Sequence, residues 1–344
     1  MKVAISGFGR IGRLALRIMA EKKLLGKKID VVAINDTHDI NAVAHLLRYD
    51  STHGRFGGTV ELQTGATLPS ASEATGNNLI VNGYSIPIVA SRDPLTLPWA
   101  KMGVDIVLEA TGAFTDRDGA AKHLAAGAKK VLISAPAKNP DVTIVPGVNE
   151  KAYKKKEHNI ISLASCTTNC LAPVAKVLND SLTIKSGFMT TCHAYTNDQK
   201  VLDDFHKDLR RARTSATNII PTTTGAAKAI GEVIPALKGK LDGLSLRVPV
   251  VTGSINDLTV LVSKQTTKDE VNALLKAAAN GPMKGILGYT QDPVVSTDFI
   301  SDPHSGTVDS LATCVLGDHV KVLTWYDNEW GYTNRVVDAI ERIL

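Results

Sequence analysis

The chain has 344 residues, 44% of them hydrophobic and 21% charged, with a formal net charge of +5 at pH 7, which is the composition of a globular protein of about two domains. Scattered basic residues and an aromatic content of 5% argue against nucleic-acid binding, and four cysteines are too few for a disulfide scaffold. No apolar run could span a membrane and the N-terminus has no signal-peptide pattern, so we expect a cytoplasmic protein with no membrane partner.

The first strand and helix enclose a glycine-rich turn. An apolar strand at residues 3–5 runs into Gly7-Phe8-Gly9-Arg10-Ile11-Gly12, and a helical apolar pattern follows. Glycines in this pattern make a tight turn and let the backbone approach a pyrophosphate. A second strand, at 29–34, ends in Asn35 and Asp36, and an acidic residue there can bind ribose hydroxyls. The pattern favours a dinucleotide site over a glycine turn in another kind of α/β protein.

Strands and helices alternate through the rest of the first half. We expect a helix at 41–48, hairpin strands within 59–90, and strands at 104–110 and 131–134 around a helix at 120–126. The small polar segment 63–78 is expected to be a surface loop. This alternation is typical of a doubly wound parallel sheet, whose ligands bind at the carboxyl ends of strands. Thr111, Gly112 and Ser134 stand at such ends, although each could be a plain cap or turn residue.

The segment around Cys166 joins a strand to a helix. Residues 160–164 are typical of the end of a buried strand, and apolar residues recur at helical spacing from Leu171 onward. Ser165 is a candidate N-cap, which places Cys166 at the helix N-terminus. Free N–H groups there favour an anion, so we expect a lowered thiol pKa and a nucleophilic Cys166. The alternative is a small buried cysteine with no chemical role.

After Cys166 the strands become longer and are grouped. They are expected at 187–195, 244–249, 257–262 and 320–326, with helices at 224–233 and 268–280 and a closing amphipathic helix at 329–344. Such grouping predicts an α+β domain on a mixed or antiparallel sheet. We therefore expect an α/β protein: a Rossmann-type doubly wound parallel sheet at 1–165, closed by the helix 329–344, and an α+β catalytic domain at 166–328.

Position alone does not identify the partner of Cys166. A thiol nucleophile needs a base, and His193 stands near the end of an apolar strand, but the chain has nine histidines. Cys166 and Cys170 could share a helix face, yet no second ligand pair has the spacing of a zinc site, so no metal is expected. Cys170, Cys192 and Cys314 are expected to be packing residues.

Six motifs stand in one order along the chain. They are Gly7-Phe8-Gly9-Arg10-Ile11-Gly12-Arg13, Ala164-Ser165-Cys166-Thr167-Thr168-Asn169-Cys170-Leu171-Ala172-Pro173, His193-Ala194-Tyr195-Thr196, Thr224-Gly225-Ala226-Ala227-Lys228-Ala229, Arg247-Val248-Pro249 and Trp325-Tyr326-Asp327-Asn328-Glu329-Trp330-Gly331-Tyr332. Together they resemble the phosphorylating glyceraldehyde-3-phosphate dehydrogenases from the first residues to the last. The resemblance implies a homotetrameric oxidoreductase of glycolysis or gluconeogenesis that converts D-glyceraldehyde 3-phosphate, NAD and inorganic phosphate to 1,3-bisphosphoglycerate.

The resemblance also implies roles for individual residues. Cys166 corresponds to the family's nucleophile and His193 to its base. The residues that correspond to cofactor contacts are Gly7, Gly9, Arg10, Ile11, Gly12, Asn35, Asp36, Arg92, Thr111, Ser134, Asn328 and Tyr332. The residues that correspond to groups holding the substrate or phosphate are Ser165, Thr167, Thr196, Arg211, Thr224, Gly225 and Arg247. In such a site the Cys166 thiolate, stabilised by the His193 imidazolium, adds to the aldehyde, and free His193 then accepts the hydroxyl proton.

Two features depart from the family pattern. Thr37 follows Asp36 where strictly NAD-using relatives commonly have leucine, and Phe205 replaces a proline or serine. Thr37 could bind a 2′-phosphate that the Asp36 carboxylate would repel, so we expect NAD as the main cofactor with some use of NADP. The segment 63–78 is longer than is usual in the family.

Other functions remain open. Erythrose-4-phosphate dehydrogenase is the nearest alternative, but the hydroxyls in the motifs at 193–196 and 224–228 are those expected for binding phosphate. A semialdehyde dehydrogenase is disfavoured by the motif at 325–332. A non-catalytic NAD-binding protein on the same fold is disfavoured because Cys166 and His193 are both present.

Overall fold

The chain folds into two compact units in the computed structural model, which describes residues 1–65, 74–342 and 344. The first unit contains Met1–Ile144, Lys151–Leu163 and Thr333–Leu344, and the second contains Val145–Glu150 and Ala164–Tyr332. Residues 145–150 therefore group with the second unit, although the sequence places them in the first domain. Most of the last helix, α8 (Trp330–Arg342), belongs to the first unit.

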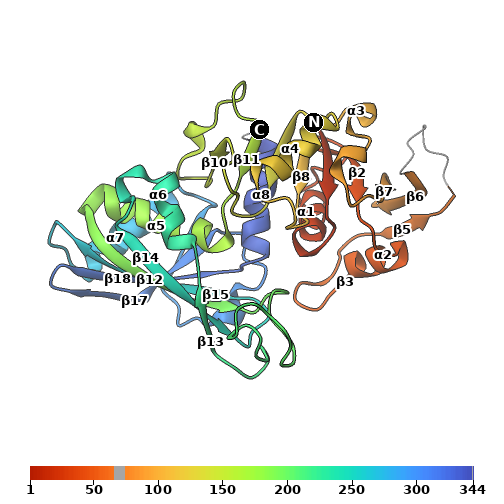
Figure 1. Ribbon diagram of the computed structural model, residues 1–344. Helices are drawn as coiled ribbons and strands as arrows, with labels where there is room; N and C mark the ends of the chain where they lie inside the picture. Colours follow the sequence, from red (N-terminus) through yellow and green to blue (C-terminus); the bar gives the residue numbers. More distant parts are fainter. Residues whose placement is uncertain (66–73, 343) are drawn as a thin grey trace. The chain divides into compact units, whose positions relative to one another are not determined.

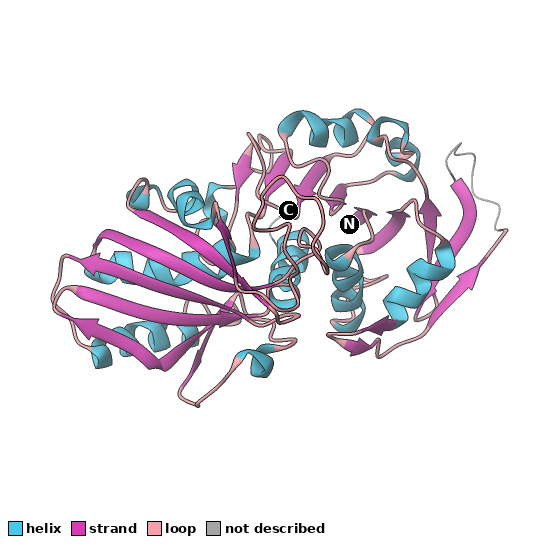
Figure 2. Cartoon of the chain, turned by 60° about the horizontal axis from the view of Figure 1, so that its bottom comes forward, coloured by secondary structure: helices cyan, strands magenta, loops and turns pink. Residues whose placement is uncertain are grey.

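The first unit is built on a mostly parallel sheet with the strand order β10-β11-β9-β8-β1-β2-β7-β6-β5 (Figures 1 and 2). Its strands are β1 (Lys2–Ser6), β2 (Asp30–Asn35), β5 (Val60–Gln63), β6 (Ala74–Val81), β7 (Tyr84–Val89), β8 (Ile106–Glu109), β9 (Lys130–Ile133), β10 (Val142–Thr143) and β11 (Ile160–Ser162). β1 pairs in parallel with both β2 and β8, so the strand order reverses at β1. This is the doubly wound sheet that the sequence predicts, extended at one edge by the antiparallel strands β5 and β6.

Helices and short elements complete the first unit. They are α1 (Arg10–Glu21), α2 (Ile40–Arg48), α3 (Trp99–Met102), α4 (Arg117–Ala125), the 3₁₀ turn η1 (Pro94–Thr96) and a two-stranded sheet of β3 (Tyr49–Asp50) and β4 (Gly54–Arg55). A further 3₁₀ turn, η2 (Glu150–Ala152), lies where the chain changes unit. Lys22 and Lys28 form ion pairs with Asp338 and Glu341, which fasten α8 to this unit.

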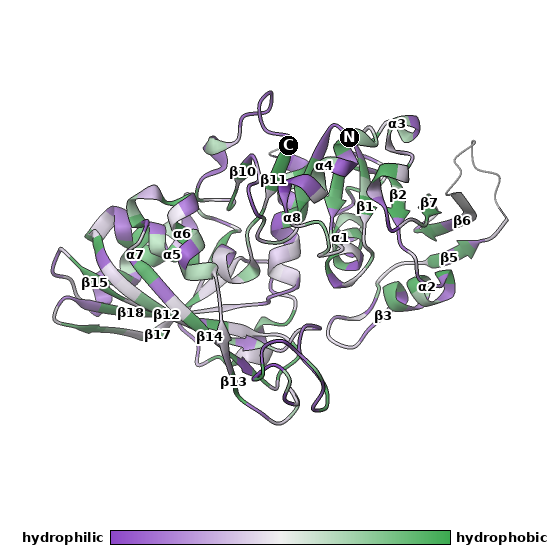
Figure 3. Cartoon of the chain, viewed as in Figure 1, coloured by the Kyte–Doolittle hydropathy of each residue, from purple (hydrophilic) through white to green (hydrophobic). Residues whose placement is uncertain are grey.

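Apolar packing explains the central strands. Val3, Ala4 and Ile5 are completely buried, as expected for a parallel strand covered on both faces. Figure 3 accordingly shows β2 and β8 mostly in the colour of hydrophobic residues. Gly12 brings α1 close to the turn after β1, because a Cβ at this position would lie 2.2 Å from the Gly7 carbonyl oxygen.

The predicted surface loop at 63–78 is wrong in part. Gln63 ends β5, and residues 74–78 begin β6, which pairs with both β5 and β7. Residues 66–73 lie outside the described part of the chain. Residues 74–78 do not alternate between apolar and polar side chains, so the sequence gives no strand signal there. Backbone hydrogen bonding to β5 and β7 does not require that alternation.

The second unit is built on a mixed sheet with the order β13-β14-β12-β15-β18-β17-β16. Its elements are α5 (Cys166–Leu182), β12 (Ile184–Ala194), β13 (Ile220–Thr223), α6 (Ala226–Val233), η3 (Pro235–Leu237), β14 (Leu241–Val248), β15 (Ser254–Val262), α7 (Lys268–Asn280), β16 (Leu287–Thr290), η4 (Ser296–Phe299), β17 (Gly306–Leu316) and β18 (His319–Tyr326). Helices α5, α6 and α7 lie on one face of the sheet (Figure 1), over a core that includes Leu178, Ile230 and Leu275. The α+β expectation is thus confirmed, with β13, β16 and β17 as strands that the sequence did not predict.

None of the helices formed by the described residues is long and apolar enough to cross a membrane.

Candidate active site

Cys166 is the first residue of α5, as the sequence predicts. The Ser165 hydroxyl accepts a hydrogen bond from the Thr168 backbone N–H at 3.0 Å, which confirms the N-cap. Ala164, just before it, has φ +53°, a left-handed conformation that is rare for a residue with a Cβ. The Tyr332 hydroxyl donates to the Ala164 carbonyl oxygen at 3.1 Å. The backbone that leads into Cys166 is therefore held on both sides.

Cys166 and His193 lie within hydrogen-bonding distance. The Sγ atom is 3.4 Å from Nε2 of His193, which stands at the end of β12. The His193 Nδ1 atom is 2.6 Å from the Ala194 carbonyl oxygen and 2.7 Å from Nη1 of Arg247. Arginine can only donate and a carbonyl can only accept, so these two contacts suit different tautomers. Only the Nδ1–H tautomer, bonded to Ala194, leaves Nε2 free to accept the thiol proton.

The strand register brings Arg247 to this pair. Arg247 on β14 pairs with two residues of the sheet. Its parallel partner is His193 on β12, and its antiparallel partner is Ile220 on β13. Arg247 Nη1 also donates to the Ala194 carbonyl oxygen at 3.1 Å. The 3.4 Å contact with Cys166 selects His193 from the nine histidines, which sequence position alone could not do, and the strand pairing adds Arg247 to the pair.

The protonation states differ from the expected thiolate–imidazolium pair. Burial, reinforced by the charge of Arg247, lowers the pKa of His193 to about 3. Burial raises the pKa of the Cys166 thiol, although Arg247 and backbone N–H groups oppose this shift. The direction of the Cys166 pKa shift is therefore opposite to the predicted lowering by the helix N-terminus, because desolvation opposes the backbone N–H groups. Burial favours the uncharged form of both side chains.

A buried hydroxyl chain lies beneath Cys166 and His193. The Tyr326 hydroxyl is 2.9 Å from the hydroxyls of both Thr167 and Thr191. The Tyr326 ring contacts the His193 ring edge-on at a centroid distance of 5.9 Å. The sequence did not single out Tyr326 as a site residue, and its only signal was the motif at 325–332. Thr167, expected to bind phosphate, is buried and has its hydroxyl in this chain.

A second arginine lies near Arg247. The Arg211 charge contributes to lowering the pKa of Arg247, although burial is the main cause. Arg211 Nε donates to the Thr222 hydroxyl at 2.7 Å, and its Nη1 forms an ion pair with Asp198. These contacts hold the guanidinium of Arg211 in place and partly balance its charge.

The other expected phosphate-binding residues stand around the same strands. The Thr196 side chain is exposed, and its backbone N–H donates to Gln199 at 3.2 Å. Gly225 is the N-cap of α6, and the Thr224 hydroxyl accepts from the Ala226 N–H at 3.2 Å. Asn328 is expected from the sequence to contact the cofactor rather than phosphate; it is buried in the second unit, does not line the dinucleotide pocket described below, and its side-chain oxygen accepts from the Ser254 hydroxyl at 2.8 Å.

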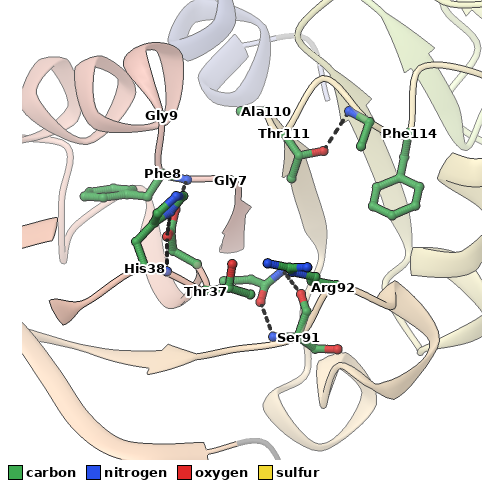
Figure 4. Close-up of a pocket in the computed structure, with 13 residues that line it drawn as sticks. Gly7, Phe8, Gly9, Thr37, His38, Ser91, Arg92, Ala110, Thr111 and Phe114 are labelled. Atoms are coloured by element: carbon green, nitrogen blue, oxygen red, sulfur yellow. Dashed lines mark hydrogen bonds and ion pairs between the residues drawn. The ribbon is translucent and has the colours of Figure 1, made fainter. Parts of the chain in front are cut away.

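A pocket of about 400 Å³ lies at the carboxyl end of the first unit's sheet (Figure 4). It is lined by Gly7, Phe8, Gly9, Asn35, Asp36, Thr37, His38, Ser91, Arg92, Ala110, Thr111, Ala113 and Phe114. Six of these are among the predicted cofactor residues. The predicted residues Arg10, Ile11, Gly12 and Ser134 do not line it, and Tyr332 is buried against Ala164 in the other unit. The sequence missed Phe8, Ser91 and Phe114 as lining residues.

The pocket fits a dinucleotide. Gly7 has φ +89°, and a Cβ there would lie 2.6 Å from the Thr111 nitrogen. A Cβ at Gly9 would meet no atom of the described residues within 4 Å beyond its chain neighbours, so glycine leaves open space beside the N-terminus of α1. Gly9, the N-cap of α1, has no side chain with which to cap that terminus, and a helix N-terminus favours an anionic group such as a pyrophosphate.

Asp36 is held at the end of β2. One carboxylate oxygen accepts from the Phe8 N–H at 2.9 Å. The other accepts from the His38 N–H at 2.9 Å and lies 2.7 Å from its ring Nδ1. In Figure 4 the His38 ring lies beside Phe8 and Gly7, and Thr37 and Arg92 point into the pocket. The carboxylate thus stands where adenosine ribose hydroxyls would bind.

Comparison with known proteins identifies the family of the chain. Residues 1–117 match the sequence model described as the glyceraldehyde 3-phosphate dehydrogenase NAD binding domain, and residues 165–328 match that of the C-terminal domain. The chain is 56% identical over 339 residues to "Glyceraldehyde-3-phosphate dehydrogenase" of Geobacillus stearothermophilus, covering 98% of this chain and 96% of the relative. It is 55% identical to "Glyceraldehyde-3-phosphate dehydrogenase 1" of Bacillus subtilis (strain 168), with the same coverage. The relative from Streptomyces coelicolor is 54% identical over 98% of this chain and 97% of its own length. These matches cover nearly the whole chain, so the chain belongs to the glyceraldehyde-3-phosphate dehydrogenase family.

Proposed function

We propose that this protein is an NAD-dependent enzyme that oxidises D-glyceraldehyde 3-phosphate with inorganic phosphate to 1,3-bisphosphoglycerate. The observation that carries the proposal is the 3.4 Å contact between Cys166 Sγ and His193 Nε2. The names and high identity of the relatives support the same activity. The first unit serves as the NAD-binding domain and the second as the catalytic domain.

Cys166 is the nucleophile and His193 the base. Neutral His193 accepts the thiol proton through Nε2 as sulfur adds to the aldehyde carbon, and then returns it to the carbonyl oxygen, which gives a hemithioacetal. Neutral again, His193 accepts the hemithioacetal hydroxyl proton, while NAD held in the first unit would supply the hydride acceptor. The resulting thioester remains on Cys166 until inorganic phosphate attacks it and releases the acyl phosphate. The Tyr326 ring, fixed by its hydroxyl contacts to Thr167 and Thr191, packs edge-on against the His193 ring and supports it throughout.

Arg247 and Arg211 supply charge for two anions. Phosphate groups bind well to arginine because the guanidinium is always charged and donates from several N–H groups. Arg247 is placed next to His193 by the sheet register, and Arg211 lies near it. Ser165, Thr167, Thr196, Thr224 and Gly225 are proposed to complete the substrate and phosphate sites with hydroxyl and backbone groups.

NAD is the cofactor expected to occupy the pocket of the first unit. The glycine turn would receive the pyrophosphate, and Asp36 would accept hydrogen bonds from the ribose hydroxyls. Arg92 and Thr111 line the same pocket. We propose that Ser134 and Asn328 also contribute, and that Arg10 and Ile11 act through backbone N–H groups. Some use of NADP is also proposed, because Thr37 lines the pocket next to Asp36.

The protein is proposed to act as a homotetramer in the cytoplasm, in glycolysis or gluconeogenesis. Several large apolar side chains of the second unit are more than two-thirds exposed: Phe188, Val201, Leu202, Phe205, Leu209 and Ile219. Exposed large apolar side chains are typical of a surface that another subunit covers. Size-exclusion chromatography with light scattering would test the tetramer.

The test of the activity follows formation of reduced nicotinamide from glyceraldehyde 3-phosphate, with and without inorganic phosphate, using NAD or NADP. We expect sustained turnover that requires phosphate and proceeds faster with NAD. Phosphate-independent turnover, or preference for erythrose 4-phosphate, would instead support erythrose-4-phosphate dehydrogenase. Binding of NAD without any turnover would support the non-catalytic alternative.

A further inference from the structure

A buried polar chain lies behind one wall of the dinucleotide pocket. Trp99 Nε1 donates to His123 Nδ1 at 2.9 Å, and His123 Nε2 lies 2.9 Å from a Glu109 carboxylate oxygen. The other oxygen of Glu109 accepts from the Thr111 backbone N–H at 2.8 Å and from the Thr111 hydroxyl. Trp99 and His123 are completely buried, and Glu109 is 1% exposed. None of these three residues lines the pocket.

The indole N–H of Trp99 determines the direction of the hydrogen bonds that follow it. Indole can only donate, so Nδ1 of His123 must accept and a neutral imidazole carries its proton on Nε2. That N–H donates to Glu109, which accepts three hydrogen bonds from His123 and Thr111 together. A buried carboxylate needs such donors, because an unsatisfied charge in the interior is costly.

This series of hydrogen bonds ends at Thr111, which forms part of the pocket wall. Thr111 lines the pocket, and its hydroxyl oxygen accepts from the Ala113 N–H at 3.0 Å. The Phe114 ring, also in the wall, packs edge-on against His123 with ring centroids 6.1 Å apart. Gly7 of the glycine turn packs so closely on Thr111 that a Cβ would lie 2.6 Å from its nitrogen. A shift of Thr111 would therefore change both the wall and the glycine turn.

We propose that Glu109 is a positioning residue for the dinucleotide: held by His123 and Trp99, it keeps the Thr111 turn in the conformation that binds the nucleotide. This inference rests on the proposed NAD-binding function. It assigns a binding role to a carboxylate that does not touch the ligand.

The test compares NAD affinity in Glu109→Gln with that of the wild type by isothermal titration calorimetry. The amide keeps the side-chain shape but presents a donor to either His123 or Thr111, each of which already donates. We expect the Kd for NAD to rise about tenfold, the effect of losing a hydrogen bond to a charged group. The kcat at saturating NAD should change less than about twofold, because only binding depends on the wall.

A second readout uses the protein without nucleotide. Hydrogen exchange followed by mass spectrometry should show faster exchange in residues 110–114 of Glu109→Gln. Tyr84→Phe is the matched control, because it removes a hydrogen bond to the Asp30 carboxylate in the same unit at residues that do not line the pocket. It should lower stability while leaving the NAD Kd and the exchange of residues 110–114 unchanged.

Trp99→Phe provides a second variant if Glu109→Gln does not fold. It keeps a ring in the core but removes the donor that sets the His123 tautomer, so we expect a smaller rise in the Kd, about threefold. A variant that folds with wild-type NAD affinity and wild-type exchange at 110–114 overturns the proposal. If the wild type itself does not bind NAD, the proposed function fails instead.

Discussion

The helices α1 and α5 both follow a buried strand, yet their N-termini differ in what they can bind. Gly9 is the N-cap of α1, contributes no side chain and lines the pocket, where a Cβ on it would meet no atom of the described residues within 4 Å beyond its chain neighbours. Ser165 is the N-cap of α5 and bonds the Thr168 N–H, and the next residue is Cys166. The first terminus is suited to receive an anionic ligand, whereas the second presents a nucleophile.

The same comparison shows that a helix N-terminus does not by itself determine a pKa. Burial raises the pKa of the Cys166 thiol in spite of the backbone N–H groups of α5. At α1 an open pocket would let a hydrated phosphate exchange water for N–H donors. At the N-terminus of α5 the cost of desolvating a charged group outweighs the attraction of the helix dipole, whereas at the N-terminus of α1 the attraction of the dipole can dominate.

The largest expected effect concerns the nucleophile at α5. Cys166→Ala should lower kcat/KM for glyceraldehyde 3-phosphate by about 10⁵-fold, because no other group forms the covalent intermediate. The reduction of NAD would be followed by absorbance. NAD affinity, measured by calorimetry, should stay near that of the wild type because Cys166 does not line the dinucleotide pocket. Substantial remaining turnover would mean that another residue is the nucleophile.

The next effect concerns pH and the base beside Cys166. Unfolded histidine binds a proton with a pKa near 6.5, whereas burial lowers the pKa of native His193 to about 3. Between about pH 6.5 and about pH 3 the unfolded state therefore binds more protons than the native state. As the pH falls through this range, the free energy of unfolding should decrease by up to about 5 kcal/mol because of His193. Chemical denaturation at several pH values should show a steeper loss in the wild type than in His193→Gln. Equal slopes would contradict the low native pKa.

A smaller effect is expected at the open terminus of α1. Gly9→Val should raise the Kd for NAD about a hundredfold, because the side chain fills space left for the pyrophosphate. Its thermal stability should stay near that of the wild type, since a Cβ there meets no other protein atom among the described residues. Gly7→Ala is the contrasting variant and should destabilise the fold through its positive φ and its contact with Thr111. Unchanged NAD binding in Gly9→Val would exclude this terminus as the pyrophosphate site.

The smallest effect concerns the cap of α5. Ser165→Ala should cost about 1 kcal/mol of stability through the lost N-cap, and should also lower kcat by misplacing Cys166. Thr267→Ala removes the N-cap of α7, where the Thr267 hydroxyl accepts from the Glu270 N–H, and serves as the control. Scanning calorimetry should show similar losses in both variants, with kcat unchanged only in Thr267→Ala. A similar kcat in both would mean that the cap has no effect on the chemistry.

Sequence patterns predicted the elements whose signals are local. The strand and glycine turn at 3–12 and the N-cap at Ser165 depend on neighbours in the chain, and the structure has them at these positions. β17 was missed because its polar residues hide the alternation. Asp309 in that strand is buried and accepts from Trp325 on β18 at 3.2 Å, a partner that no local pattern reveals.

The order of the residues alone indicated the family, Cys166 as the candidate nucleophile, His193 as its candidate base and the acidic residue after β2, because these rest on motifs and on spacing. Only the folded chain brought His193 within 3.4 Å of Cys166, and only the register of β12 and β14 placed Arg247 beside His193. Only the folded chain decided the protonation of that pair, because desolvation depends on everything packed around a group. The hydrogen bonds that link Trp99, His123, Glu109 and Thr111 also depend on the tertiary structure, because they join residues of three elements that meet only after folding.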